Sequence, residues 1–377
     1  MQALVTGSAG LIGSHLVDEL LRQGYAVRGY DALEPLVHLE GKPDWIAPEA
    51  EFIQADVRDA GALARALAGV DIVFHLAAYG GFFPEFGKLC DVNVTGTARL
   101  LETIRDGRFD VRKVVVASSQ VVYREGTVRC RAHGELYPAE RSLARLQAGE
   151  WTVPCPRCGC ACESVATRED APTSGQTPYA VSKYAQERLA LVWSAQAGIA
   201  VTALRYPCTY GPRQSIFNPY TGIISIFSTR VTRGLPPILY EDGEQTRDLC
   251  YVEDVARATA FAARTAELDG RVVNVGSGRP VSVRAVAHAV IEVFDATLEP
   301  EIAGDFRPGD MRSLFTDPQP LASLGFRTRV ELREGLTRYL EWIGTRGDVR
   351  EYFTQAQDHL RRTGLVQRAD VRRAAHG

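Results

Sequence analysis

The sequence contains no apolar run that approaches the length of about 20 residues needed for a membrane-spanning helix. It has no excess of charge of one sign, because 43 Lys and Arg stand against 46 Asp and Glu, for a formal net charge of -3. Long basic runs and repeats of fixed period are also absent. Nucleic-acid binding needs clustered Lys and Arg to neutralise phosphates, so a small molecule is the better expectation for the main ligand.

The features of a signal peptide are missing as well, since the chain opens with the apolar pattern MQALVTG and no basic segment. We therefore expect a cytoplasmic protein without a membrane partner, in which thiols stay reduced and the eight Cys form no disulfide framework. The 377 residues are 45% hydrophobic and 24% charged, which is typical of a globular protein with a sizeable core. This length allows two or three domains, or one large sheet domain with a smaller partner.

The first half of the chain alternates short apolar runs with longer amphipathic ones. The runs lie at 3–7, 25–31, 71–78 and 112–119, and the amphipathic stretches lie at 14–24, 61–70 and 93–106. This alternation predicts an α/β fold with a doubly wound parallel sheet (Rossmann) covered by helices on both faces. It breaks at 124–168, which is rich in Arg, Gly, Pro and Cys, and then resumes with a predicted helix over 179–196 and a strand over 200–206.

From Pro207 the chain becomes irregular and Pro-rich, with predicted helices over 227–234 and 252–264 and a strand over 272–278. This composition predicts a smaller α/β substrate-binding lobe that closes over the carboxyl edge of the sheet. Further Arg-rich helices are expected towards the C-terminus, in EYFTQAQDHLRRTG and ADVRRAAHG.

A glycine-rich turn, Gly7-Ser-Ala-Gly10-Leu11-Ile12-Gly13, follows the first strand and opens the first helix. Glycines suit this place because the turn is tight and the backbone must approach a pyrophosphate at the helix N-terminus. Asp31 ends the second strand, 18 residues beyond Gly13, where a carboxylate accepts hydrogen bonds from ribose hydroxyls and repels a 2′-phosphate. The pattern indicates an NAD site rather than an NADP site, and the simpler alternative is a glycine turn beside a surface Asp.

Tyr179 and Lys183 lie four residues apart at the start of a predicted helix, and Ser118 and Ser119 end the strand VVVASS. This spacing puts Tyr179 and Lys183 on one helical face, where an ammonium can stabilise a phenolate. A Tyr with an ordinary pKa near 10 is a poor base at neutral pH, so we expect Lys183 and an oxidised nicotinamide to lower the pKa of Tyr179. The alternative is a surface pair on a helix.

These motifs resemble the extended short-chain dehydrogenase/reductase family, in its branch of nucleotide-sugar epimerases and dehydratases. The resemblance covers nearly the whole chain, through GSAGLIG, HLAA, NVTGT, ASSQVVY, YAVSK, RYPCTYGP, RDLCYVEDVARA, NVGSG and RPGDMR. It implies that Asp56 and Val57 contact the adenine. It also implies a set of further cofactor-binding residues: Leu76, Ala77, Ala78, Asn93, Ser118, Tyr179, Lys183 and Tyr206.

Aligned on Tyr123, Ser119 takes the place of the family's catalytic Ser or Thr, which hydrogen-bonds the reacting sugar hydroxyl. The 4,6-dehydratases of the family have an Asp-Glu pair directly after that residue, whereas this chain has Gln120 and Val121. Neither side chain can act as an acid or base, and the Glu usual in the family's decarboxylases is missing too. Epimerisation remains, because the family performs it with Tyr, Ser, Lys and NAD.

Within the family, the chain resembles the bacterial dTDP-L-rhamnose 4-epimerases in its Cys-rich insertion, its NPYTG segment at 218–222 and its RRTGLV helix end. The resemblance implies a C4 epimerase of a dTDP-6-deoxy-hexose, and a homodimer formed through two helices of each subunit. One departure is Pro207-Cys208, where such enzymes commonly have Phe-Asn. The expected substrate-binding residues are Gly80, Gln120, Cys208, Asn218, Arg247, Arg307 and Asp310.

Other functions stay open. One alternative is an epimerase of another nucleotide-diphosphate sugar, such as a uronic acid or heptose derivative, or an NDP-4-keto-sugar reductase. A different class is a non-catalytic dinucleotide-binding sensor or scaffold, which the presence of Tyr179 and Lys183 disfavours. We divide the chain into an NAD-binding domain (1–206 and 246–277) with the insertion at 124–168, a substrate-binding lobe (207–245 and 278–345) and C-terminal helices (346–377).

The insertion contains two pairs of metal-ligand residues, each separated by two others: Cys130 with His133, and Cys155 with Cys158. This spacing is typical of a tetrahedral structural zinc site. A short insertion buries little apolar surface, so a metal would supply folding free energy. We expect these four residues to be the ligands, with Cys160 and Cys162 as substitutes, and the alternative is a redox-active or chance cluster of thiols.

Overall fold

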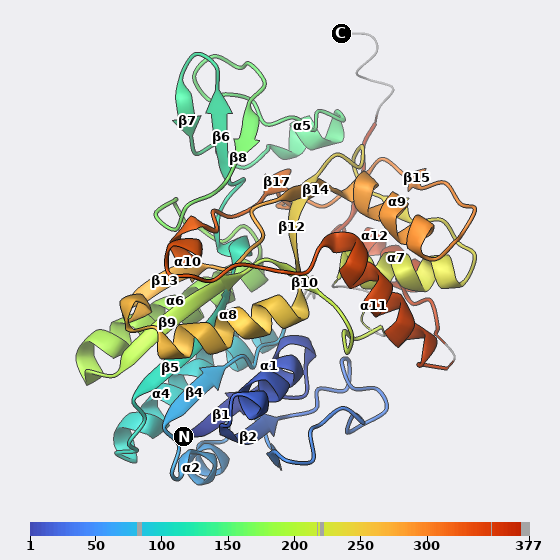
Figure 1. Cartoon of the computed structure of the whole chain (residues 1–377). Coiled ribbons are helices and arrows are strands. Elements are labelled where there is room, and N and C mark those ends of the chain that lie inside the picture. The colour runs from blue at the N-terminus through green and yellow to red at the C-terminus, as the bar shows by residue number, and fades with distance from the viewer. Residues whose placement is uncertain (81–84, 217, 219–221, 348, 371–377) are drawn as a thin grey trace.

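The computed structural model describes residues 1–80, 85–216, 218, 222–347 and 349–370. Its centre is a seven-stranded parallel sheet in the order β13-β9-β5-β4-β1-β2-β3, with helices on both faces (Figure 1), which confirms the predicted α/β Rossmann-like class. The strands are β1 (Gln2–Thr6), β2 (Ala26–Asp31), β3 (Glu51–Gln54), β4 (Ile72–His75), β5 (Lys113–Ser119), β9 (Ala200–Tyr206) and β13 (Arg271–Asn274).

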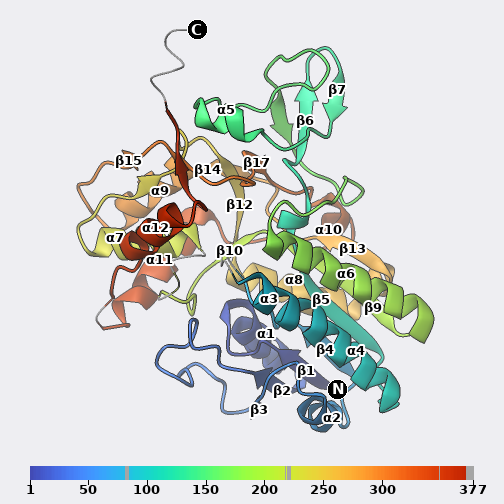
Figure 2. The ribbon, with the colours of Figure 1, turned by 180° about the vertical axis from the view of Figure 1, so that it is seen from behind.

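Two layers of helices cover this sheet (Figure 2). One layer contains α1 (Leu11–Arg22) and α8 (Val252–Arg264), and the other contains α2 (Ala60–Leu67), α4 (Gly96–Asp106) and α6 (Pro178–Ala197). Each helix packs its apolar stripe against strands that are apolar on both faces, as expected for a parallel sheet. Where the sequence predicted one helix over 93–106, a π-helical turn (Cys90–Thr95) separates α3 (Phe86–Leu89) from α4.

The C-terminal part of the chain forms a second layer of structure beyond the carboxyl ends of the strands (Figure 1). Its apolar cluster lies between helices and a four-stranded sheet that the sequence analysis did not anticipate in full. The helices are α7 (Ile223–Thr232), α9 (Val283–Val293), α11 (Leu332–Gly344) and α12 (Phe353–Arg362), whereas the short α10 (Gln319–Ser323) packs against β13 of the parallel sheet. The sheet contains β10 (Cys208–Tyr210), β12 (Thr246–Tyr251), β14 (Pro280–Ser282) and β17 (Ser313–Leu314), and two-residue strands form the pairs β11 (Ile238–Leu239) with β15 (Glu301–Ile302) and β16 (Asp305–Phe306) with β18 (Gln367–Arg368).

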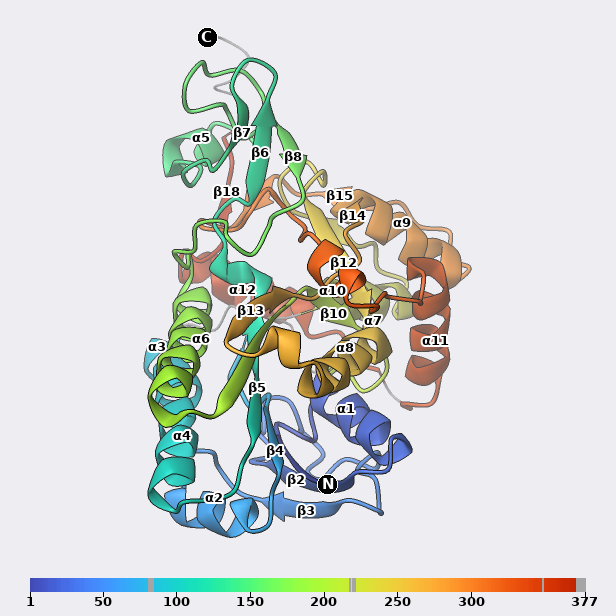
Figure 3. The same ribbon diagram turned by 60° about the vertical axis from the view of Figure 1, so that its left-hand side comes forward.

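The insertion projects from the body of the molecule as a small separate unit (Figure 3). It contains the antiparallel strands β6 (Thr127–Cys130), β7 (Gly134–Leu136) and β8 (Glu163–Val165) and the short helix α5 (Leu143–Gln147). The five apolar clusters of the described core include no side chain from 124 to 168.

Two predictions fall partly outside the described residues. Residues 219–221 of the NPYTG segment and residues 371–377 of the second C-terminal helix are not described. Among the helices that the structure describes, none combines the length and apolarity required to cross a membrane.

Candidate active site

A cavity of about 650 Å³ lies between the carboxyl edge of the parallel sheet and the C-terminal layer. Residues from both parts line it, so the two layers together enclose one site. Every sequence-predicted catalytic and substrate-binding residue lines it, and so does every predicted cofactor-binding residue except Asn93. The cavity therefore brings together motifs that are spread from Gly7 to Asp310.

The glycine-rich turn lines one part of this cavity, and its close packing leaves no room for larger residues. Gly7 has a φ of +73°, and a Cβ on it would lie 2.8 Å from the backbone nitrogen of Ala77. A Cβ on Gly13 would lie 1.9 Å from the carbonyl oxygen of Gly7. Helix α1 begins after Gly10 with no side-chain cap on its first turn, so its N-terminal N–H groups are available to an anion. The turn fits a dinucleotide pyrophosphate.

Two carboxylates stand at the ends of neighbouring strands on the same side of the cavity. Asp31 accepts hydrogen bonds from the backbone N–H groups of Ala9 (2.9 Å) and Leu33 (2.8 Å), which fix its orientation. Asp56 accepts from the guanidinium of Arg58, which holds the pKa of that carboxyl below its usual range. The geometry places acidic groups where a ribose and a base would lie next to the glycine-rich turn.

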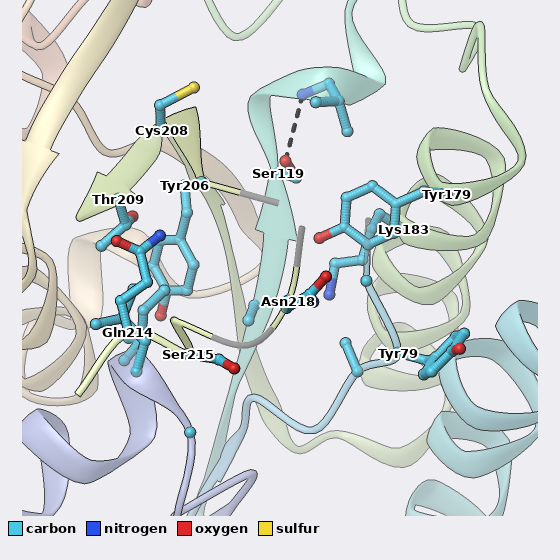
Figure 4. Close-up of a pocket in the computed structure, with 18 of the residues that line it drawn as sticks. Tyr79, Ser119, Tyr179, Lys183, Tyr206, Cys208, Thr209, Gln214, Ser215 and Asn218 are labelled. Carbon is cyan, nitrogen blue, oxygen red and sulfur yellow. Dashed lines mark hydrogen bonds between the residues drawn. The ribbon is translucent and has the colours of Figure 1, made fainter. Parts of the chain in front are cut away.

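The start of helix α6 positions Tyr179 and Lys183. Thr177 caps the helix by accepting a hydrogen bond from the backbone N–H of Ala180, and Pro178 occupies the first helical position, where its missing N–H costs nothing. Tyr179 and Lys183 therefore project from the first turns towards the end of β5, and Figure 4 shows the Tyr179 hydroxyl directed at the space below Ser119. Ser119 lies close enough to the Tyr179 hydroxyl to influence its pKa, and the Ser119 hydroxyl oxygen accepts a hydrogen bond from the backbone N–H of Val121 (3.4 Å).

The sequence predicted a lower pKa of Tyr179 from Lys183 together with an oxidised nicotinamide, and the protein alone shows the effect of burial. Burial raises the pKa of Tyr179 to about 12, and the nearby Ser119 side chain offsets only part of that rise. Burial also lowers the pKa of Lys183 to about 7, while the nearby Glu187 acts in the opposite direction. The Lys183 ammonium donates to the side-chain oxygen of Gln186. Desolvation thus favours the neutral form of both groups in the protein alone.

Two predicted cofactor-binding side chains line the cavity but have hydroxyl groups that are bonded to other parts of the protein. The Ser118 hydroxyl donates to the carboxylate of Glu187 (2.8 Å), although Ser118 lines the cavity. The Tyr206 hydroxyl is bonded to Thr259 on α8 (2.7 Å).

Asn93 differs in position from the other predicted cofactor-binding residues. Asn93 is fully buried and does not line the cavity. It accepts from the backbone N–H of Tyr79 (2.7 Å) and donates to the carbonyl of Tyr79 (2.9 Å) and to the hydroxyl of Ser182 (2.9 Å). Because all of these partners are protein groups, Asn93 joins the loop after β4 to helix α6 and positions the site from behind.

The C-terminal layer supplies the opposite wall of the cavity. Arg247 on β12 donates to the carboxylate of Asp310 (2.8 Å), and the guanidinium of Arg307 lies over the ring of Tyr240 at 4.9 Å. Figure 4 shows Asn218 beside Lys183, and Tyr206, Thr209 and Gln214 across the cavity from Tyr179.

The end of the cavity near Ser119 is only weakly polar. The Gln120 amide donates to the Cys208 thiol at 3.4 Å, and Val121 and Pro207 are neighbouring lining residues. Gly80 lies against Tyr179, since a Cβ on it would be 3.3 Å from the Tyr179 ring.

The cavity lining also includes polar and aromatic side chains that the sequence analysis did not select. Gln176 and Thr177, directly before Tyr179, and Arg58, directly after Val57, could have been found from their neighbours in sequence. Tyr30 and Tyr79 are likewise direct neighbours of predicted residues. Others come from segments without a local signal: Glu34, His38, Tyr210, Gln214, Ser215, Phe227, Tyr240, Gln245 and Phe353.

The predicted metal ligands lie outside this cavity. Cys130, His133, Cys155 and Cys158 come together on the insertion, and their ligand atoms all lie within 4.8 Å of one another. The substitutes Cys160 and Cys162 do not belong to this group.

Known proteins resemble this chain in both sequence and structure. A model of the NAD dependent epimerase/dehydratase family matches residues 3–142 and 159–276. These ranges include the glycine-rich turn, Ser119, Tyr179 and Lys183, whereas the unmatched stretch between them contains Cys155 and Cys158.

Individual relatives cover almost the whole chain. The chain is 35% identical to the dTDP-L-rhamnose 4-epimerase of Burkholderia thailandensis over 352 residues, which cover 90% of this chain and 94% of that protein. Its structure is similar to that of the UDP-glucose 4-epimerase of Thermotoga maritima with UDP-glucose, with a TM-score of 0.76, 28% identity and coverage of 92% of this chain and 100% of that chain. It is also similar to the UDP-glucose 4-epimerase of Thermus thermophilus in complex with NAD, with a TM-score of 0.71, 30% identity and coverage of 93% and 100%.

Proposed function

The chain belongs to the NAD dependent epimerase/dehydratase family, and we propose that it inverts C4 of a nucleotide-diphosphate sugar through a transient 4-keto intermediate. The observation that carries this proposal is the set of side chains around Tyr179. Ser119, Tyr179 and Lys183 line the cavity, and the positions after Ser119 are Gln120 and Val121. Such a set can remove and return the proton of the C4 hydroxyl. It offers no carboxyl group beside Ser119 for the further proton transfers of a dehydration.

The protein groups divide the proton chemistry at C4 between them. As a phenolate, Tyr179 accepts the proton of the sugar C4 hydroxyl, and Ser119 donates a hydrogen bond to the same sugar oxygen. Lys183, as an ammonium, stabilises the phenolate and donates to a ribose hydroxyl. When bound, oxidised NAD supplies a positive charge that favours the phenolate and a reversible hydride acceptor for C4. Once the keto sugar has turned in the cavity, Tyr179 returns the proton, and the protein ends in its starting state.

We propose a dTDP-6-deoxy-hexose, with dTDP-L-rhamnose as the favoured substrate. The 35% identity to the Burkholderia thailandensis dTDP-L-rhamnose 4-epimerase supports this choice. A second support is the lining beside Ser119, where Val121 and Pro207 offer an apolar surface to a methyl group. Arg247 and Arg307 also line the cavity, and their guanidinium groups suit the diphosphate.

A panel of nucleotide sugars tests the proposal. The protein is incubated with NAD and, separately, with dTDP-L-rhamnose, UDP-glucose, UDP-glucuronate and a GDP- and an ADP-sugar, while the anomeric and H4 proton NMR signals are followed. We expect conversion of dTDP-L-rhamnose to its C4 epimer without net consumption of NAD. Faster conversion of another sugar would overturn the substrate assignment but leave the epimerase assignment in place. Net oxidation of NADH with a 4-keto sugar would indicate a reductase. No conversion of any sugar by an NAD-loaded protein would favour the sensor.

We also propose that the protein is a homodimer through helix α6. Val181, Leu189 and Val192 on this helix are 38–52% exposed, although the opposite face of the helix is buried against β5. Their spacing puts them on one face, and Figure 2 shows α6 on the outside of the sheet next to α4. Light scattering after gel filtration should give twice the chain mass for the native protein, and a monomer for Val181→Glu/Val192→Glu. A native monomer would contradict this.

A further inference from the structure

The insertion carries the one cluster of potential metal ligands found among the described residues. Cys130, at the end of β6, and His133 lie on one loop, and Cys155 and Cys158 lie on a second loop. These loops are separated by 21 residues in sequence, yet their ligand atoms come within 4.8 Å of one another. None of the four residues lines the cavity, and Figure 3 shows the insertion projecting away from the parallel sheet, so these side chains have no part in the proposed chemistry.

The separations within the cluster have the values expected around one tetrahedral metal ion. The Cys130 and Cys158 sulfurs are 3.7 Å apart, and His133 Nδ1 lies 3.5 Å from the Cys130 sulfur and 3.4 Å from the Cys155 sulfur. With metal–sulfur and metal–nitrogen bonds of about 2.3 and about 2.0 Å, tetrahedral angles give S···S and S···N separations of about 3.8 and about 3.5 Å. A disulfide needs an S–S bond of about 2.0 Å, so the sulfurs are spaced for a shared ion rather than for a covalent pair.

The backbone of the second loop is organised around its ligands. The N–H of Cys155 donates to the carbonyl of Cys160 (2.8 Å), the N–H of Gly159 donates to the carbonyl of Cys155 (2.9 Å), and the N–H of Arg157 donates to the Cys155 sulfur (3.4 Å). Hydrogen bonds to a sulfur stabilise its thiolate form, which is the form that binds metal.

Each loop also ends at a glycine in the left-handed region directly after its second ligand. Gly134 follows His133 with a φ of +70°, and Gly159 follows Cys158 with a φ of +74°. Glycine adopts this conformation without steric cost, so both loops can turn sharply behind their ligands. Two loops of different sequence thus share one local design, which a chance gathering of thiols would not require.

From these observations we propose that Cys130, His133, Cys155 and Cys158 bind one Zn²⁺ in a structural site. Three sulfur ligands and one imidazole are the soft and borderline donors that zinc prefers, and four protein ligands leave no position open for catalysis. Binding releases the three thiol protons to solvent, and neither the ion nor the sulfurs change oxidation state.

The position of the insertion explains what the zinc does for the rest of the molecule. The insertion adds no side chain to the apolar clusters of the core, so the zinc provides the order that apolar packing does not. Its Arg141 is buried and reaches the C-terminal layer, where it pairs with Glu241 (2.9 Å) and donates to the carbonyl of Asp310 (2.7 Å). The zinc thereby holds in place a segment that supports the wall of the catalytic cavity.

Metal analysis tests the site directly. The full-length protein is purified without a metal-affinity step or chelator, dialysed against metal-free buffer and analysed by inductively coupled plasma mass spectrometry, and its free thiols are counted in denaturant. We expect about one zinc per chain, with all eight Cys reduced once the metal is removed. Less than about one tenth of a zinc per chain, a disulfide within the cluster or stoichiometric iron would each overturn the proposal.

A pair of variants tests the choice of ligands with readouts that do not depend on activity. Cys158→Ser should lose zinc and should be cut by trypsin at arginines of the insertion at least about tenfold faster than the native protein. Cys160→Ser, in the same loop, is the matched control and should keep both zinc and resistance to trypsin. Both variants should still bind NAD, which shows that they are folded. Retention of zinc by Cys158→Ser, or its loss from Cys160→Ser alone, would overturn the assignment.

Discussion

The cavity around Tyr179 and the proposed zinc site gather polar side chains in opposite ways. Tyr179 and Lys183 are held by helix α6, which packs on a sheet whose strands are buried on both faces. The proposed ligands Cys130 and Cys158 lie on the projecting insertion, which adds no side chain to the apolar clusters of the core. The first site inherits its order from the core, whereas the second supplies order to its own surroundings. Removing one side chain should therefore reduce the reaction rate at the first site and unfold the surrounding loops at the second.

The largest effect should come from replacing the proposed base in the core-supported site. Tyr179→Phe keeps the ring and removes the hydroxyl, so turnover of the epimerised sugar should fall by about a thousandfold. The thermal unfolding midpoint and the NAD content should stay at their native values, because the helix and the sheet remain packed. Initial rates measured by NMR check the loss of turnover, and a thermal melting curve checks the unchanged stability. A variant that loses activity and stability together would break the comparison.

The next effect should appear where the two regions meet. Arg141 pairs with Glu125 (3.0 Å) and Glu241 (2.9 Å), and all three side chains are at most 2% exposed. Arg141→Met leaves both carboxylates short of a partner, so the free energy of unfolding should fall by about 3 kcal/mol. Urea unfolding checks this value.

The double variant Arg141→Met/Glu125→Gln serves as the control for that measurement. It removes one of the two carboxylates and should recover part of the lost stability. The zinc content should be unchanged in both proteins, because neither residue is a ligand. An Arg141→Met protein as stable as the native one would show that the insertion and the C-terminal layer are not coupled through this contact.

A smaller effect should follow the titration of Lys183. Its pKa in the folded protein is lowered to about 7 from an ordinary value of 10.5, so the unfolded chain holds more protons than the folded protein between these values. Stability from this group therefore rises with pH across that window, by up to about 1.4 kcal/mol per pH unit. The free energy of unfolding of the NAD-free native protein and of the Lys183→Met variant can be measured in urea. The difference between them, native minus variant, should increase from pH 7 to pH 9. Parallel profiles would show that Lys183 is not desolvated.

The smallest effect should come from Cys208. The Gln120 amide donates to its thiol at 3.4 Å, which is a weak hydrogen bond, and serine offers an acceptor of similar size. Cys208→Ser should change kcat/KM for the epimerised sugar by less than about fivefold, which corresponds to less than about 1 kcal/mol. A larger loss, seen in kcat rather than KM, would place Cys208 at the reacting carbon.

Much of this architecture could be predicted from the sequence, because strong local patterns determine it. Alternating apolar and amphipathic runs predicted the parallel sheet, and the helix predicted over 252–264 spans the same residues as α8. The sheet of the C-terminal layer was missed because its pairings are distant, as in Thr246 with Ser282 and Ser313. No local periodicity marks strands of two or three residues.

The site shows the same division between local and distant information. Short motifs indicated the glycine-rich turn, Tyr179 and Lys183, and all of these residues line one cavity. The rise that burial causes in the pKa of Tyr179 was not predicted, because the cost of burying a charge depends on the complete fold. Asn93 was assigned to the cofactor because its partners, Tyr79 and Ser182, could not be identified from its own motif.

The two adjacent serines at the end of β5 have a consequence for comparing relatives. Successive residues of a strand face opposite sides, so the hydroxyl of Ser118 donates to Glu187, whereas that of Ser119 faces the Tyr179 side of the cavity. An alignment shifted by one position would exchange a scaffold serine for a catalytic one while matching Ser to Ser. In a relative, the serine that contacts the counterpart of Glu187 should therefore be identified as the scaffold residue. The residue that follows it then carries the proposed reacting hydroxyl.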